Sequence, residues 1–143
     1  MLMCHVNAAG QTELSRFTLP LTGETVKYGV DICFREVNVS GLCLMRTLND
    51  TIRGSLINEF GVKVLDFQYD SNKKKIKLYN VVKMLDKWYI RKVIRKDIKF
   101  LLRVLSDDCG TIEGSREFKA ANSDGFIVTN KRYKITYMFS LLE

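Results

Sequence analysis

Cysteine and histidine are the residue types that most directly indicate metal binding or nucleophilic catalysis in a sequence. This chain has four cysteines, Cys4, Cys33, Cys43 and Cys109, and a single histidine, His5. No two cysteines have the C-x-x-C spacing of zinc and dithiol sites, and His5 has no evident nucleophile partner. We therefore expect free thiols, no metal site and no bound cofactor.

Three acidic residues, Asp107, Asp108 and Glu113, form the other group with catalytic potential. Because the two aspartates end a helical stretch and precede Gly110, they are more typical of a turn than of acid–base or metal chemistry. The glycine motifs that cradle phosphates and the G-x-S-x-G nucleophile motif are missing from the sequence. These observations predict a protein that is not an enzyme.

The bulk composition describes one folded, basic domain. A chain of 143 residues suits a single domain, and 46% hydrophobic residues with 10% aromatics are typical of a packed core. No apolar run approaches the roughly 18 residues of a membrane span. The net charge of +7 favours anionic partners, whether nucleic acid, phospholipid or an acidic protein.

Alternation of apolar and polar residues predicts strands over most of the chain. Residues 1–23 show little periodicity, and we expect them to form a flexible N-terminal segment before a single domain at 24–143. The predicted strands cover residues 26–34, 39–48, 51–58, 62–69 and 74–80, and then 116–120, 125–129 and 132–140. Their short connections indicate an antiparallel meander.

Between the two groups of strands the apolar period changes to three or four residues, which predicts a helix over 81–105, broken near Lys87. Its apolar side is formed by Leu85, Trp88, Ile94, Ile98, Leu101, Leu102 and Leu105. The opposite side is basic, and the polar residues at 106–110 should end the helix.

A sheet with one apolar face and a helix with one apolar stripe can bury each other. We therefore predict an α+β fold in which a curved antiparallel sheet, an incomplete β-barrel, carries the amphipathic helix on its concave face. In this arrangement Trp88, Ile98 and Leu102 are buried. The same apolar residues could form a solid core or line a cavity, and the periodicity does not distinguish the two.

Two stretches carry a resemblance to a known family: "VSGLCLMRTLNDTIRGSLINEFGVKVLDFQYD" at 39–70 and "LDKWYIRKVIRKDIKFLL" at 85–102. Their pattern of strands, an apolar-Gly tip and a Trp-bearing helix resembles uncharacterised outer-membrane lipoproteins of Bacteroidetes. It is more distantly similar to the LolA/LolB lipoprotein-localisation family. The resemblance implies a LolA/LolB-like half-barrel that encloses an apolar cavity for lipid or lipoprotein acyl chains. It also implies a place in the cell envelope, at the outer membrane facing the periplasm.

The resemblance assigns roles to particular residues of this chain. The lipid-cavity candidates are Val30, Ile32, Leu44, Leu56, Leu65, Phe67, Trp88 and Ile94. The charge of the basic side of the helix, rather than the resemblance, indicates candidates for contact with an anionic surface, although such a side can also be merely solvated: Arg91, Lys92, Arg95, Lys96 and Lys99. Phe60, in the "NEFG" tip, matches a protruding loop that faces the membrane, although such an aromatic can also fold back into the core.

The N-terminal stretch "MLMC" departs from the lipoprotein pattern, because neither an apolar run nor a small residue precedes Cys4. We therefore expect that a signal peptide is not present in this chain, and lipidation of Cys4 stays open. An alternative function is a small basic nucleic-acid-binding domain that uses the helix at 83–103. A structural component of an envelope complex is a third possibility.

Overall fold

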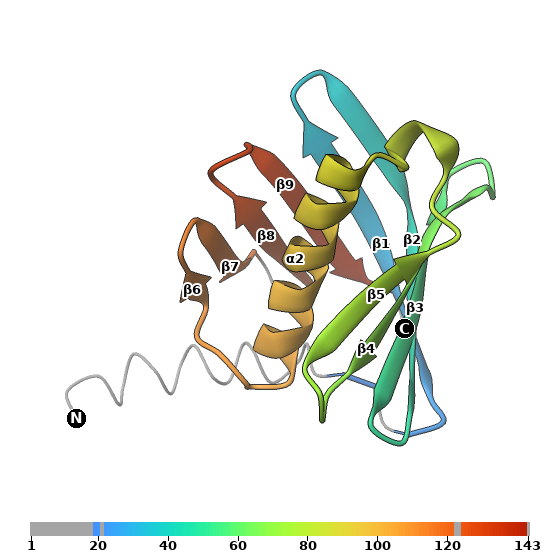
Figure 1. Cartoon of the computed structure of the whole chain (residues 1–143), viewed down its shortest axis with the longest axis vertical. Coiled ribbons are helices and arrows are strands. Elements are labelled where there is room, and N and C mark those ends of the chain that lie inside the picture. Colours follow the sequence, from blue (N-terminus) through green and yellow to red (C-terminus); the bar gives the residue numbers. More distant parts are fainter. Residues whose placement is uncertain (1–18, 21, 122–123, 143) are drawn as a thin grey trace.

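An open sheet of nine antiparallel strands dominates the computed structural model, which describes residues 19–20, 22–121 and 124–142 (Figure 1). The strands are β1 (Thr25–Phe34), β2 (Val37–Leu48), β3 (Thr51–Asn58), β4 (Lys63–Asp70), β5 (Lys75–Tyr79), β6 (Ile112–Glu113), β7 (Arg116–Ala120), β8 (Gly125–Asn130) and β9 (Ile135–Leu141). Their order is β5-β4-β3-β2-β1-β9-β8-β7-β6, so two meanders join where β9 pairs with β1. Most of the N-terminal segment 1–23, with Cys4 and His5, lies outside the described residues.

The eight strands predicted from alternation are confirmed, each within about three residues of its expected bounds. The predicted antiparallel pairing is also confirmed for all of them. The prediction missed β6, because its two residues are too few to show a period of two.

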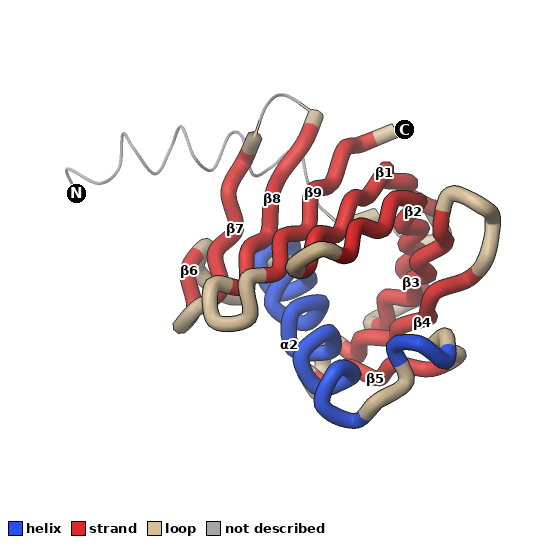
Figure 2. Tube along the Cα trace, turned by 90° about the horizontal axis from the view of Figure 1, so that it is seen from above, coloured by secondary structure: helices blue, strands red, loops and turns tan. Residues whose placement is uncertain are grey.

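Two glycines allow the sheet to curl tightly. A Cβ atom on Gly54 in β3 would lie 2.0 Å from the ring of Phe67, and one on Gly41 in β2 would lie 1.9 Å from the carbonyl oxygen of Ile57. No side chain fits at either position, so the neighbouring strand or ring approaches the backbone directly. Figure 2 shows the resulting curl, in which β1 to β5 turn around one side of the helix.

The helical segment consists of the short 3-10 helix η2 (Lys83–Leu85) and the α-helix α2 (Trp88–Leu105). The predicted break near Lys87 is therefore confirmed. Helix α2 lies inside the curl of the sheet, between β5 and β7 (Figure 2). Its buried residues are Asp97, Ile98, Phe100, Leu101, Leu102, Val104 and Leu105. The expected α+β arrangement, with one helix against an open antiparallel sheet, is present in the described part of the chain.

The prediction that Trp88 is buried is wrong, because 76% of this residue is exposed. The prediction aligned Trp88 with Leu85, but Leu85 belongs to η2 and does not share the phase of α2. Within α2, Trp88 precedes Lys92 by four residues and Lys99 by eleven, which places it on the same side as these cations. Ile98 and Leu102 are buried, as predicted.

A stack of aromatic rings fills the sheet around β1, β9, β8 and β7. The ring of Phe126 stacks on Phe118 and on Phe139, with centroids 4.8 Å apart in both pairs. Tyr28 meets Phe126 edge to face at 5.4 Å. This cluster closes the C-terminal side of the core and leaves α2 to cover the rest.

Truncation of Ile98 tests the packing of α2. We expect Ile98→Ala to lower the free energy of unfolding by about 2–5 kcal/mol, because it opens a cavity against the sheet. Lys96→Ala, on the solvent side of the same helix turn, is the matched control and should change stability by about 0.5 kcal/mol or less. Urea unfolding followed by circular dichroism measures both, and equal effects would contradict this packing.

Candidate functional site

The interior between sheet and helix is packed. Ile32, Leu56 and Phe67 from the predicted cavity, together with Asp97, Tyr137 and five further side chains, bound a space of only about 20 Å³. An acyl-chain site needs roughly 300 Å³ or more. The structure therefore corrects the expectation of an acyl-chain cavity among the described residues. Val30, Leu65 and Ile94 belong to the same core.

Leu44 is a second correction, because it faces the opposite side of the sheet from the other cavity candidates. Its neighbours Cys43 and Met45 are buried in the core. Since successive side chains of a strand point to opposite faces, Leu44 lies on the convex face. Leu44 borders a depression there, together with Arg46 and Arg53.

A buried carboxylate, Asp97, is the most elaborate polar feature of the interior, and sequence analysis did not identify it. Asp97 is 1% exposed. It accepts hydrogen bonds from Arg116 Nε on β7 (2.7 Å), Asn130 Nδ2 on β8 (2.8 Å) and the Tyr137 hydroxyl on β9 (2.5 Å). One polar residue in an otherwise apolar helix stripe was the available signal, since such a residue needs buried partners.

This cluster binds helix to sheet and has no room for a substrate. Burial and then the charge of Asp97 raise the pKa of Tyr137 well above its usual range, so the hydroxyl keeps the proton that it donates. The adjoining space of about 20 Å³ is the size of one water molecule. Asn130 Oδ1 also accepts from the backbone N–H of Tyr133 at 3.1 Å, which extends the cluster to the β8–β9 turn.

Asp97→Asn tests whether this cluster orients α2. The amide leaves Arg116 without its counter-charge and provides one acceptor oxygen in place of two, so we expect a loss of about 3 kcal/mol in unfolding free energy. Asp107→Asn, an exposed aspartate beyond the helix end, should cost about 0.5 kcal/mol or less. When Tyr137→Phe is introduced into the Asp97→Asn variant, it should lower the unfolding free energy by less than it does in wild type. The reason is that both changes break the same interaction. Additive costs in urea unfolding would contradict the coupling.

The predicted basic side of α2 divides into one structural residue and four free cations. Arg91 is half-buried and donates to Asp86 Oδ1 (2.7 Å) and to the Leu78 carbonyl (3.0 Å). The others make no ion pair with any described residue: Lys92, Arg95, Lys96 and Lys99. Because Trp88 lies on their side of α2, the helix presents an aromatic ring followed by a row of uncompensated positive charges.

Most of the exposed large apolar side chains gather at one end of the sheet. In a meander, alternate turns lie at the same end, and the Val82 N–H to Val64 O bond (2.8 Å) sets η2 beside the start of β4. We call this region the aromatic end: residues 35–37, 59–63, 83–89 and 131–134. Its exposed apolar residues are Val37, Phe60, Val62, Met84, Trp88, Tyr89 and Tyr133.

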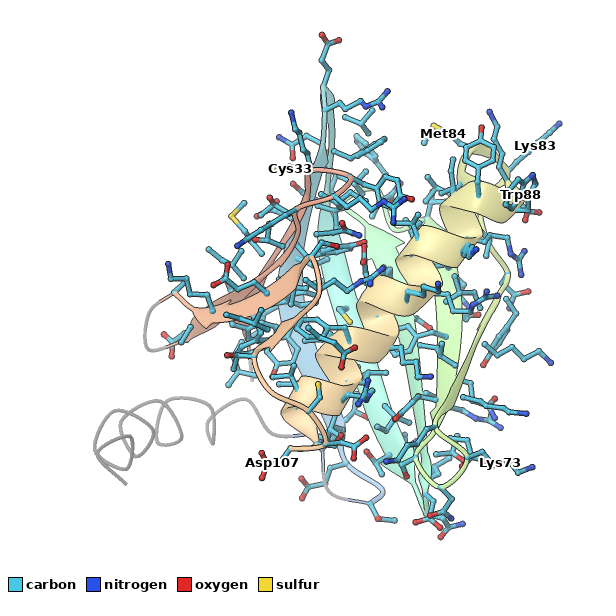
Figure 3. The ribbon with its side chains drawn as sticks, turned by 60° about the vertical axis from the view of Figure 1, so that its left-hand side comes forward. Cys33, Lys73, Lys83, Met84, Trp88 and Asp107 are labelled. Carbon is cyan, nitrogen blue, oxygen red and sulfur yellow. The ribbon has the colours of Figure 1, made fainter. Side chains whose placement is uncertain are left out.

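The aromatic end is also positively charged. Its four segments contain seven lysines and arginines against three glutamates and aspartates. The described residues in the turns at the opposite end, 49–50, 71–74, 106–110 and 121–124, have four aspartates and two lysines. Figure 3 shows the two ends, with Lys83, Met84 and Trp88 at one extreme and Asp107 and Lys73 at the other.

The β3–β4 turn holds Phe60 out in solvent. Asn58 Oδ1 accepts from the backbone N–H groups of Phe60 (3.0 Å) and Val62 (2.9 Å), and Gly61 takes a positive φ of 81°. These bonds satisfy the turn without any contribution from the ring, which is 82% exposed. Of the two predictions for Phe60 in the "NEFG" tip, a protruding ring is confirmed and a ring folded back into the core is wrong.

Two of the acidic residues considered first, Asp108 and Glu113, form ion pairs. Asp108 pairs with Lys74 Nζ (3.1 Å) and Arg103 Nε (3.4 Å), and Glu113 pairs with Arg103 Nη1 (3.0 Å). Hydrogen bonding from Lys74 is the main cause of the lowered pKa of Asp108. Cys33, Cys43 and Cys109 are free thiols.

Comparisons with known proteins leave the family of this chain open. No protein-family model matches the sequence, and no curated protein matches it significantly. Among the described residues, no group of three histidines, cysteines or acids is arranged to hold a metal ion. None of the described helices is long and apolar enough to cross a membrane. The aromatic end is therefore the candidate site with the clearest physical signature.

Proposed function

We propose that this protein is a non-enzymatic envelope protein that binds anionic lipid surfaces through its aromatic end. The observation that carries the proposal is the exposure of Trp88 and Phe60, 76% and 82%, among a local excess of positive charge. Tryptophan and tyrosine favour the membrane–water interface, where their apolar ring and polar group both find suitable surroundings. Basic residues near an anionic bilayer add about 1 kcal/mol each.

The geometry supports shallow, peripheral attachment. The turns that present the apolar side chains belong to different strand pairs and to the start of α2, so they form several contact points on one rigid scaffold. The rings of Trp88 and Tyr89 meet edge to face at 5.7 Å, and Arg132 lies 5.4 Å from the ring of Tyr133. Aromatic rings and a cation are thus already adjacent in the protein without a membrane.

The resemblance to LolA/LolB-like lipoprotein carriers is compatible with this proposal. The mechanism that we propose differs from the one that the resemblance implies. Lipid or lipoprotein acyl chains would meet the protein at the exposed aromatic end, since the space under α2 is only about 20 Å³. Phe60 keeps the role that the resemblance implies, a protruding residue facing the membrane. We include the outer membrane, on its periplasmic side, in the proposal on the strength of the resemblance.

The single tryptophan of the chain makes the proposal directly measurable, because all tryptophan emission comes from Trp88. On titration with vesicles that contain anionic phospholipid, we expect the emission to shift to shorter wavelength and acrylamide quenching to decrease. Binding should weaken as salt is raised, because screening removes the electrostatic contribution. Vesicles of neutral phosphatidylcholine alone should give a much smaller shift.

Duplex DNA serves as the competing ligand in the same assay. Binding to DNA with a steep salt dependence, and with no blue shift on vesicles, would favour the nucleic-acid alternative that uses the basic side of α2. Failure to bind vesicles at low salt would overturn the lipid proposal.

Phe60→Glu separates membrane contact from folding. The ring makes no core contact, so unfolding free energy should change by about 0.5 kcal/mol or less. Loss of an inserted phenylalanine should weaken vesicle binding roughly 10- to 100-fold, from about 1.5–3 kcal/mol of apolar burial. Leu48→Glu, an exposed residue in β2 at the opposite end, is the matched control and should bind as wild type does. Equal losses in the two variants would show that net charge alone controls binding.

A further inference from the structure

Two arginines lie directly opposite each other on the convex face of the sheet. Arg46 in β2 pairs in register with Arg53 in β3, and both are exposed. Like charges in this position destabilise a strand pair unless a counter-ion separates them. Neither arginine forms an ion pair with a described residue. The pair is therefore a local concentration of charge that no residue of the described part of the chain neutralises by an ion pair.

The arginine pair borders a depression of about 270 Å³. Its lining consists of Thr25, Leu44, Met45, Arg46, Arg53, Gly54, Ser55, Lys63, Asp66 and Tyr79. Met45 is buried on the other face and Gly54 has no side chain, so both contribute backbone to this surface. The volume lies just below the usual range for small-molecule sites, which limits an occupant to a small group.

The carboxylate that borders this depression, Asp66, is already engaged. Its Oδ1 accepts from Ser55 (2.5 Å), and its Oδ2 accepts from Asn80 (2.8 Å) and Lys63 (3.1 Å). Burial opposes ionisation of Asp66, but these hydrogen bonds outweigh it and lower the pKa of the carboxyl. Asp66 therefore stays ionised and paired with Lys63. Its hydrogen bonds come from Ser55, Lys63 and Asn80, so the N–H groups of the two arginines are not used by this carboxylate.

We propose that the Arg46–Arg53 depression binds the phosphate group of a small soluble phosphate ester. Guanidinium groups offer paired N–H donors whose spacing matches two oxygens of a phosphate, and two of them can serve a dianion. Thr25 and Tyr79 line the same space, and both residue types carry a hydroxyl that can donate to a phosphate oxygen. Leu44 supplies an apolar side against which the organic part of the ester can rest.

The phosphate of a lipid headgroup in a bilayer is the other source of the same chemistry. The position of the arginine pair relative to the aromatic end argues against this source. Arg46 lies nine residues along β2 from Val37, which belongs to the aromatic end. At about 3.3 Å per strand residue this separation is roughly 30 Å, and Arg53 lies six residues along β3 from Glu59, which is roughly 20 Å. Lys63 is the one residue of the aromatic end that also borders the depression, so a membrane held there would reach its margin but not the two guanidinium groups, which stay open to dissolved ligands. The choice between the two phosphate sources rests on the proposed function, whereas phosphate binding by the arginine pair does not.

Titration with inorganic phosphate tests the site, followed by NMR of the arginine side-chain N–H groups at constant ionic strength. We expect saturable shifts for wild type and at least tenfold weaker binding for Arg53→Gln. Arg95→Gln, which removes an unpaired cation from α2, is the matched control and should bind phosphate as wild type does. Equal weakening in the two variants, or shifts that never saturate, would overturn the proposal.

Thermal denaturation provides a second readout. Phosphate should raise the midpoint of wild type, because a ligand stabilises the state that binds it. Arg53→Gln should lose this phosphate response, and in chloride alone it should melt no lower than wild type, since it removes a repulsion. Glycerol 3-phosphate should bind at least as well as inorganic phosphate, whereas vesicle binding should be unchanged in Arg53→Gln. A full phosphate response in the variant would contradict the assignment.

Discussion

The buried carboxylate of Asp97 fixes the rotation of α2, and the surface that we propose binds membranes follows from that rotation. Its three partners come from three strands, so no turn of the helix about its own axis keeps all three bonds. With Asp97 inward, Trp88 and the free lysines face solvent. An apolar side chain at position 97 would also be buried. It would not favour this rotation of the helix over slightly different rotations about the same axis. The cluster therefore provides specificity at the cost of desolvating a charge.

Strand topology supplies the second half of the surface. Because consecutive strands pair, the turns after β1, β3 and β8 emerge at one end, and the link into α2 emerges there as well. Each turn needs only one protruding apolar residue for the end as a whole to become amphipathic. Aspartate is the commonest charged residue in the opposite turns. One end of the sheet is therefore apolar and basic, and the other end is acidic.

Local periodicity predicted most of this fold, since alternation and three-to-four spacing each reflect nearby contacts. It failed for Trp88 because the phase of a helix depends on where the helix begins, and Lys87 is extended rather than helical. It failed for Leu44 because four consecutive apolar residues, at 42–45, hide which of them face inward. The Asp97 cluster and the Arg46–Arg53 pair depend on contacts between distant segments, and spacing along the chain does not encode them.

An open sheet leaves two outer strands whose unpaired backbone groups could recruit another chain, and this fold protects both of them. On β5, Lys75 and Lys77 place charges along the strand, and Lys73 and Lys74 precede it. Arg91 from α2 also donates to the Leu78 carbonyl of that strand. At the other margin, β6 is only two residues long. Short strands and lysines are what natural proteins use against edge-to-edge aggregation. Part of the positive charge of this chain thus keeps its copies apart, and only the remainder is available for ligands.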